Sequence, residues 1–294
     1  MRELNMFKDY LLHEKRYSIN TADAYISDIS LAECYFNDTG TSLLKVDREF
    51  LKNYLASLFH AVTSTTLQRK ISALKHFFHF MNKRKLCENN PAVNLISPRK
   101  GLKLPQFLTR NEIDRIISFN FSADLKGFRN KALMELIYGS GLRVGEIVKL
   151  RRKNVDFEEE EVDILGKGKK ERVVPVTSEA ISAIEDYLMK RGDFFEPKAF
   201  LFLNMRGKPI TERGVQYIIN RIAIRAGVFR KVSPHMLRHS FASHFLENGM
   251  NLRYLQHMLG HSNLSTTQNY THLGITELQD IYNRTFPDNR KSEV

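Results

Sequence analysis

An imidazole and a guanidinium group in the segment after Ser233 are placed for work on a phosphate. His235 and Arg238 are three residues apart, so on a helix they share one face. Ser233 is a typical N-cap, and Pro234 suits the first helical turn, where a missing N–H costs nothing. A separate apolar face is expected from Leu237, Phe241 and Phe245. The segment therefore predicts a helix that holds a cation and an imidazole over an anion, although exposed Arg and His are also ordinary surface residues.

A second guanidinium group follows a glycine-rich helix stop. Gly139-Ser-Gly141 should end one helix, and Arg143 lies where the next helix begins. A guanidinium group and exposed backbone N–H groups can converge there on one phosphate. Glu146, three residues on, can orient the guanidinium group. The alternative is an Arg–Glu pair with a structural role only.

Lys167 lies in a turn of glycine and lysine, 166–170, between two strand-like runs. A lysine on such a turn can reach into a cleft and deliver a proton. The alternative for this residue is a solvated loop lysine.

Two further polar residues lie near the C-terminus. His261 follows Leu259-Gly260, and Ser265 to Gln268 has the spacing of a capping box. Tyr270 is therefore predicted on a short helix, about two turns beyond His261 at roughly 3.6 residues per turn. Its phenol is a candidate nucleophile, and a buried core tyrosine is the alternative.

Composition narrows the class of partner. The chain has 294 residues and a formal net charge of +12, with a pI of about 9.6. Such an excess favours a polyanion, with nucleic acid ahead of a membrane surface. No apolar run is long enough to span a membrane, and residues 1–10 lack the apolar core of a signal peptide. Cys34 and Cys87 are far apart, which indicates free thiols and a cytoplasmic protein.

The chain is expected to be mainly α-helical in two domains. Residues 1–96 have helical periodicity throughout, and residues 97–106 form a basic linker broken by proline and glycine. Within the first domain a helix over 64–83 carries hydroxyl and basic side chains opposite its apolar stripe. Such side chains suit phosphate and groove contacts, and a solvated surface is the alternative. Together with the basic residues of the linker, the candidate DNA-binding residues are Thr65, Thr66, Arg69, Lys70, Arg99, Lys100 and Lys103.

The second domain, residues 107–294, should combine helices with a small antiparallel β-sheet. Thr109 and Glu112 have the spacing of a capping box at its first helix. Three strand-like runs are expected between 153 and 176, followed by helices near 178–191 and 211–226. The tail from about 274 contains a short amphipathic helix, with Leu278 and Ile281 on one side.

Arg143, Lys167, His235, Arg238, His261 and Tyr270 match, in order, the signature of the tyrosine recombinase (phage integrase) family, and the Xer type resembles this chain most closely. The resemblance is strong over about 105–285, and Gly145 departs from it where Xer proteins often have serine. It implies a two-domain, C-shaped DNA clamp, with a SAM-like helical core-binding domain and a mixed α/β catalytic domain.

The resemblance also implies a mechanism. Tyr270 would attack a DNA phosphodiester and form a 3′-phosphotyrosyl bond, on the way to a Holliday junction. Arg143 and Arg238 would clamp the non-bridging oxygens, and His261 would donate a hydrogen bond to one of them. Lys167 would be the general acid, and His235 would accept the tyrosine proton or bind the phosphate. No cofactor and no metal are expected, because the sequence has no His-Glu-x-x-His motif.

The implied partner is double-stranded DNA with inverted-repeat half-sites, bound by a homo- or hetero-tetramer. A second Xer recombinase and a DNA translocase are possible further partners, and the tail could pack on its own domain or on a neighbouring protomer. Resolution of chromosome or plasmid dimers at cell division is the leading role. The alternatives are a mobile-element integrase, a type IB topoisomerase-like enzyme and a regulatory DNA-binder without chemistry.

Overall fold

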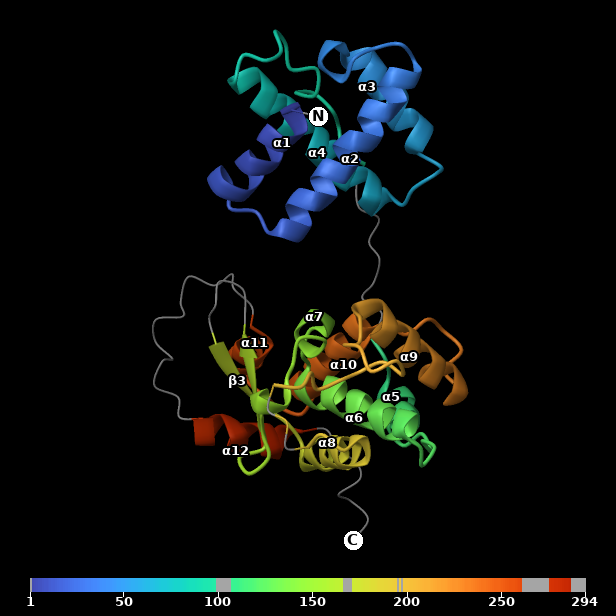
Figure 1. Ribbon diagram of the computed structural model, residues 1–294, viewed down its shortest axis with the longest axis vertical. Helices are drawn as coiled ribbons and strands as arrows, with labels where there is room; N and C mark the ends of the chain where they lie inside the picture. Colours follow the sequence, from blue (N-terminus) through green and yellow to red (C-terminus); the bar gives the residue numbers. More distant parts are fainter. Residues whose placement is uncertain are drawn as a thin grey trace. The chain divides into compact units, whose positions relative to one another are not determined.

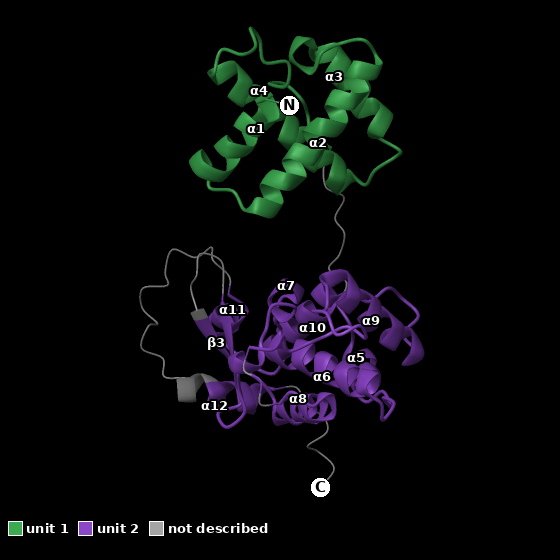
Figure 2. Cartoon of the chain, in the orientation of Figure 1, with its two compact units in different colours: residues 1–104 green, residues 105–294 purple. Residues whose placement is uncertain are grey.

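The computed structural model describes residues 2–98, 107–165, 171–194, 196, 198–260 and 275–286. The chain divides into two compact units, residues 1–104 and residues 105–294 (Figure 2). Each unit has its own hydrophobic core. None of the described helices is both long enough and apolar enough to cross a membrane.

The first unit is a bundle of helices whose ends are capped by the residues that the sequence supplies (Figure 1). Ser18, Asp47 and Thr63 each accept a backbone N–H in the first turn of the helix that follows. The elements are α1 (Arg2–Asp9), a π-helical turn (Tyr10–Glu14), α2 (Ile19–Asp38), a 3₁₀ turn (Leu43–Lys45), α3 (Arg48–Leu58) and α4 (Ser64–Lys83).

Helix α4 is the central element of this bundle. Its apolar residues are buried against α2 and α3, and Phe77 and Phe78 are almost completely enclosed. At the far end of the unit, the amide of Gln68 donates to the carbonyl oxygen of Pro98 at 2.6 Å. That hydrogen bond holds Pro98, the second residue of the predicted linker, against α4.

The second unit is built around helices, with a three-stranded sheet at one side (Figure 1). Thr109 and Glu112 form the predicted capping box at its first helix. Its helices are α5 (Arg110–Ile117), α6 (Leu125–Ser140), α7 (Val144–Ile147), a 3₁₀ turn (Arg152–Asn154), α8 (Ser178–Arg191), α9 (Glu212–Arg225), α10 (Pro234–Glu247), α11 (Leu252–Leu259) and α12 (Ile275–Thr285).

The sheet has the order β1 (Val155–Asp156), β2 (Glu161–Leu165) and β3 (Glu171–Pro175), and both pairs are antiparallel. Val162 of β2 lies opposite Val174 of β3, and both are fully buried. The inward faces of β2 and β3 therefore join the core, and α11 and α12 pack against β3. The predicted mainly helical fold with a small antiparallel sheet is confirmed.

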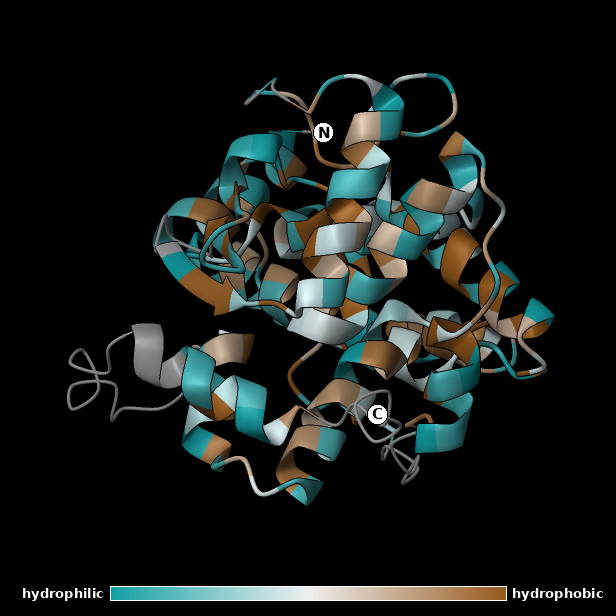
Figure 3. Ribbon diagram, turned by 90° about the horizontal axis from the view of Figure 1, so that it is seen from below, coloured by the Kyte–Doolittle hydropathy of each residue, from teal (hydrophilic) through white to brown (hydrophobic). Residues whose placement is uncertain are grey.

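Helix α6 is the buried axis of the second unit. All of its residues from Ala132 to Ser140 are buried, and α8 and α10 pack against it. The ribbons coloured by hydropathy show apolar and polar residues alternating along the helices of the chain (Figure 3). Gly141 ends the helix in the left-handed conformation, with φ 59°, as the helix stop in the sequence predicts.

The described part of the tail packs on its own domain. Tyr282 of α12 is fully buried, and its hydroxyl donates to the carbonyl oxygen of Gly139 at 2.5 Å. Its ring also contacts the rings of Phe245 and Phe286. Ile281 is partly buried on the same side, whereas the side chain of Leu278 lies outside what the structure describes.

Candidate active site

Helix α10 carries Arg238 into the interior of the second unit. Ser233 caps the helix by accepting the N–H of Met236 at 3.2 Å, and Pro234 occupies the first turn. Leu237, Phe241 and Phe245 are completely buried, so they fix the helix against the core. The predicted helix and its apolar stripe are confirmed.

The guanidinium group of Arg238 is anchored by two backbone carbonyl groups. It donates to the oxygen of Gly141 and to the oxygen of Leu259, each at 2.6 Å. Burial lowers the pKa of Arg238 to about 10, and the positive charges of Arg143 and Arg172 add to this effect. Arg238 remains protonated at neutral pH, but its charge is poorly compensated by its surroundings.

Arg143 lies at the N-cap of α7, directly after the turn at Gly141. One of its terminal nitrogens, Nη1, donates to Oε1 of Glu146 at 3.2 Å, and the other, Nη2, donates to the carbonyl oxygen of Gly260 at 3.1 Å. The side chain of Arg143 is still 43% exposed. The guanidinium group of Arg143 is therefore held by Glu146 and Gly260, and its exposed part is open to a ligand.

Glu146 closes the first turn of α7 and meets a third arginine. Its Oε2 accepts the backbone N–H of Arg143 at 2.8 Å. That N–H was expected to be free to bind a phosphate, and it is not. Arg172 of β3 donates to both carboxylate oxygens of Glu146, at 3.0 Å each. Burial raises the pKa of Glu146, but the hydrogen bonds from Arg172 and Arg143 and their charges bring it below the ordinary value.

The end of α11 joins these three arginines. Arg172, Arg238 and Arg143 donate in turn to the successive carbonyl oxygens of Met258, Leu259 and Gly260. Carbonyl groups at a helix C-terminus lack intrahelical partners and carry partial negative charge. The carbonyl groups at the end of α11 thus receive hydrogen bonds from three arginines. These arginines come from β3, α10 and the start of α7, so their positive charges lie close together.

His235 lies one turn before Arg238 and is exposed. It lines an open hollow of about 300 Å³ together with residues from the starts of α7, α9 and α10, namely Val144, Glu212, Arg213, Gln216, Ser233 and Pro234. Gly145 borders this region, because a Cβ built on it would be 2.9 Å from Oε1 of Glu212. A serine at this position would require the Glu212 side chain to move.

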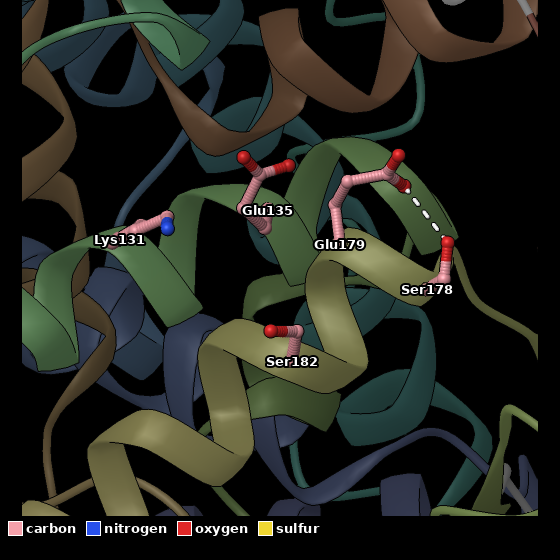
Figure 4. Close-up of a pocket in the computed structure, with 5 residues that line it drawn as sticks. All are labelled: Lys131, Glu135, Ser178, Glu179 and Ser182. Atoms are coloured by element: carbon pink, nitrogen blue, oxygen red, sulfur yellow. Dashed lines mark hydrogen bonds between the residues drawn. The ribbon is translucent and has the colours of Figure 1, made fainter. Parts of the chain in front are cut away.

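A second hollow, of about 340 Å³, lies between α6 and α8 (Figure 4). It is lined by Lys131, Glu135, Ser178, Glu179 and Ser182, none of which belongs to the predicted site. Ser178 and Glu179 contact each other across its edge at 3.4 Å.

The structure thus brings together Arg143, Glu146 and Arg238, while His235 lies on the same helix as Arg238. The other three predicted catalytic residues, Lys167, His261 and Tyr270, lie outside the described residues. Neighbouring elements are described: β2 and β3 flank residues 166–170 in the chain, and the end of α11 directly precedes His261.

The candidate DNA-binding residues of α4 differ in exposure. Thr65 is exposed and Thr66 is half-buried next to the cap at Thr63. The expected exposure of Lys70 is wrong: it is 6% exposed, and its ammonium group pairs with the buried carboxylate of Asp28 at 3.0 Å. Arg69 pairs with the other oxygen of Asp28. The helical periodicity of residues 64–83 predicts a polar face for Lys70, but it cannot show that the carboxylate of Asp28 packs against that face. Arg99, Lys100 and Lys103 lie outside the described residues.

His244 and His239 also lie on α10, and neither belongs to the predicted site. His244 is 2% exposed, and its Nδ1 contacts the hydroxyl of Tyr138 at 3.2 Å. His239 is exposed, and its ring meets the edge of Phe107. Within the described ranges, no three His, Cys, Asp or Glu side chains lie together as a metal site would need.

Comparisons with known proteins give the class. The description "Phage integrase family" matches residues 106–276, and "Phage integrase, N-terminal SAM-like domain" matches residues 4–85. The chain belongs to the phage integrase family, the tyrosine recombinases.

Similar proteins indicate which type of tyrosine recombinase this chain is. The chain is 38% identical over 296 residues to the tyrosine recombinase XerC of Pediococcus pentosaceus, with 98% of each chain covered. It is 38% identical over 294 residues to the XerC of Halalkalibacterium halodurans, with 97% of each covered. Among solved structures, the XerH recombinase in a post-cleavage complex with a palindromic difH substrate has a TM-score of 0.70 and 25% identity, covering 90% of this chain and 80% of that one. The prediction of a site-specific recombinase enzyme of the Xer type is confirmed.

Arg172 is the residue that reasoning from the sequence missed. It ends a run of charged residues that follows Lys167 in the sequence, Lys169-Lys170-Glu171-Arg172, where a solvated side chain is the usual outcome. The available signal was strand alternation: Arg172 lies two residues before Val174, on the face of β3 that joins the core.

Proposed function

We propose that this recombinase cuts and rejoins duplex DNA at a specific site through a covalent bond between Tyr270 and the scissile phosphate. The observation that supports the site is the arrangement of Arg143 and Arg238. Their guanidinium groups are held on the adjacent carbonyl groups of Gly260 and Leu259, the two residues that precede His261 in the chain. Two cations so arranged suit a phosphate with two non-bridging oxygens.

The chemistry follows from charge. When the phenolic oxygen of Tyr270 attacks phosphorus, negative charge builds up on the non-bridging oxygens of the pentavalent transition state. Arg143 and Arg238 stabilise that charge, and His261 donates a hydrogen bond to it. Glu146 supports Arg143 without touching the phosphate.

Proton transfer accompanies both halves of the reaction. His235 accepts the tyrosine proton or hydrogen-bonds the phosphate, and Lys167 protonates the departing 5′-oxygen. The product is a 3′-phosphotyrosyl bond and a free 5′-hydroxyl. Attack by the 5′-hydroxyl of a second strand then releases the tyrosine and conserves the bond energy, through a Holliday junction.

The proposed partner is double-stranded DNA with inverted half-sites, engaged by the two domains 1–96 and 107–294 on either side of the linker 97–106. The net charge of +12 and the DNA-bound state of the similar XerH support a DNA partner. We assign this activity to a tetramer in the cytoplasm that resolves chromosome or plasmid dimers. Whether the second pair of subunits is another Xer recombinase, and whether a DNA translocase activates the complex, are parts of the same proposal.

Thr65, Thr66, Arg69, Arg99, Lys100 and Lys103 are the proposed DNA contacts of the first domain and linker. Lys70 is left out of that set because its ammonium group is already paired in the interior.

A suicide substrate tests the proposal. A nick next to the cleavage position lets the short 5′-hydroxyl fragment diffuse away, so the protein stays attached to DNA. Incubation with candidate chromosomal palindromes should give a covalent adduct at one of them. Tyr270→Phe should bind the same duplex and form no adduct. A normal yield of adduct from Tyr270→Phe would exclude Tyr270 as the nucleophile.

A further inference from the structure

Arg172 is engaged at all three of its guanidinium nitrogens. Nη1 and Nη2 donate to the two oxygens of Glu146 at 3.0 Å, and Nε donates to the carbonyl oxygen of Met258 at 3.1 Å. The side chain is only 13% exposed. Such a two-pronged contact fixes both the distance and the plane of the carboxylate, which an ammonium group cannot do.

The contact between Arg172 and Glu146 determines how strongly Glu146 binds Arg143. The carboxylate of Glu146 is 12% exposed and serves two arginines, but the shares are unequal. Arg172 takes both oxygens, whereas the Arg143 guanidinium makes one contact of 3.2 Å and stays 43% exposed. Because the charge of Glu146 is balanced mainly by Arg172, the charge of Arg143 is left for a ligand.

Removal of Arg172 would change that balance. The carboxylate would keep Arg143 as its only close cation among the described residues, and a carboxylate and a guanidinium group favour the two-pronged arrangement. Arg143 would then turn toward Glu146, lose its contact with Gly260 and offer less charge to a phosphate.

We infer that Arg172 is a positioning residue for the recombination reaction: it holds Glu146 and the end of α11 so that Arg143 faces the scissile phosphate. This inference rests on the proposed function. It adds to the predicted site a residue from a strand that the motif does not include.

The chain contains a matched control. Arg230 also makes a two-pronged pair with a glutamate that caps a helix: it donates to the two oxygens of Glu112 at 2.9 and 2.5 Å. It likewise donates to a backbone carbonyl group, that of Phe107, at 2.9 Å. Arg230→Ala therefore removes the same kind of interaction from the same unit, at a helix that carries none of the predicted catalytic residues.

The experiment compares full-length wild type, Arg172→Ala, Arg172→Lys and Arg230→Ala on two suicide substrates. One has an ordinary scissile phosphodiester. The other has a methylphosphonate at that position, which has one non-bridging oxygen replaced by a methyl group and carries no negative charge. Duplex affinity and thermal unfolding are measured for each variant.

On the phosphodiester, Arg172→Ala should slow adduct formation about 10²-fold, the size of loss expected when a catalytic group is displaced by about 1 Å. On the methylphosphonate the loss should be at least about tenfold smaller, because a neutral group needs less positive charge from Arg143. Arg172→Lys should behave like Arg172→Ala while it unfolds closer to the wild-type temperature. Arg230→Ala should cleave both substrates at the wild-type rate per folded molecule.

A merely structural role predicts a different pattern. If Arg172 only stabilised the fold, its variants would lose activity equally on both substrates and in proportion to unfolding, which would overturn the inference. Equal rates for the Arg172 and Arg230 variants would do the same. If instead the wild-type protein formed no adduct on any duplex, the proposed function itself would fail.

A double-mutant comparison gives a second, independent readout. Glu146→Gln and Arg172→Ala, combined, should slow cleavage no more than the more severe single variant, because both act through one interaction. Fully multiplicative losses would show that Arg172 does not act through Glu146.

Discussion

Gly260 lies directly against the guanidinium group of Arg172, so a Cβ built on Gly260 would be 3.0 Å from Cζ of Arg172. Gly260 also has a positive φ of 62°, which ends α11 in the left-handed conformation. The absence of a side chain at Gly260 therefore has two effects. It permits the left-handed turn, and it lets the guanidinium group of Arg172 lie against the backbone of the residue that precedes His261.

Gly260→Ala should separate these two effects. The left-handed conformation costs a residue with a Cβ about 1–2 kcal/mol of unfolding free energy. Displacement of Arg172 should also slow adduct formation on a suicide substrate. Gly192→Ala is the control, because Gly192 has a φ of 86° and its Cβ would meet no atom within 4 Å. Gly192→Ala should lose a similar amount of stability and form the adduct at the wild-type rate. Equal slowing of adduct formation in both variants would contradict a role for the contact between Gly260 and Arg172.

Arg143→Lys and Arg238→Lys test the proposed phosphate clamp. Lysine keeps the charge but cannot hold a backbone carbonyl group and a phosphate oxygen in one rigid plane. We expect cleavage to fall about 10²–10³-fold, as for the loss of one donor to a developing oxyanion. Duplex affinity, measured by gel shift, should change much less. Wild-type cleavage by Arg143→Lys would be incompatible with the clamp.

His244 should make the stability of the second unit depend on pH. Burial lowers the pKa of His244 below its ordinary value of 6.5, so the folded state takes up a proton less readily than the unfolded state. Its stabilising contribution is complete above about pH 6.5 and declines as the pH falls toward the folded-state pKa, by at most about 1.4 kcal/mol per pH unit. Thermal unfolding between pH 7.5 and 5 measures this slope.

His244→Gln is the comparison for that series, because glutamine keeps polar atoms near Tyr138 without a group that titrates. The variant should be less stable at pH 7.5 and should show a flatter decline below pH 6.5. An identical slope in both proteins would assign the pH dependence to other groups.

Lys70→Ala should destabilise the first unit. It would leave the Asp28 carboxylate, which is 3% exposed, with Arg69 as its only charged partner among the described residues. Breaking a buried ion pair from one side costs about 3 kcal/mol or more. Chemical denaturation of the full chain, followed by probes in each unit, measures the loss.

Thr65→Ala gives the opposite behaviour, because Thr65 is exposed on the same helix. It should leave stability within about 0.5 kcal/mol of wild type and weaken duplex binding if the proposed DNA contact exists. A stable Lys70→Ala protein with reduced DNA affinity would reverse our assignment of Lys70.

Tyr282→Ala should destabilise the second unit by about 3–5 kcal/mol, as for other large-to-small core substitutions. Tyr282 is fully buried, and its hydroxyl bonds to Gly139 in the central helix α6. Asn283→Ala, at the next and exposed position, is the control and should have little effect. Equal melting temperatures would show that α12 does not pack on its own domain in solution.

The sequence by itself determined the elements and the family. Thr109 and Ser233 are helix caps with short-range partners, so their positions in the chain were enough to predict where their helices begin. The run from Pro234 to Phe245 defined its buried face by periodicity alone. The ordered set of basic residues, histidines and tyrosine indicated a tyrosine recombinase before any contact was known.

Only the tertiary structure decided which charged side chains are paired. Lys70 and Asp28 are 42 residues apart in the chain, and Arg172 and Glu146 are 26 apart. Local periodicity says which face of an element a residue occupies, but not which side chain arrives opposite it from a distant segment. The burial of a charge depends on that partner, because an unpaired charge in the interior is too costly to persist. Lys70 thus became an interior ion pair, and Arg172 became the support of Glu146.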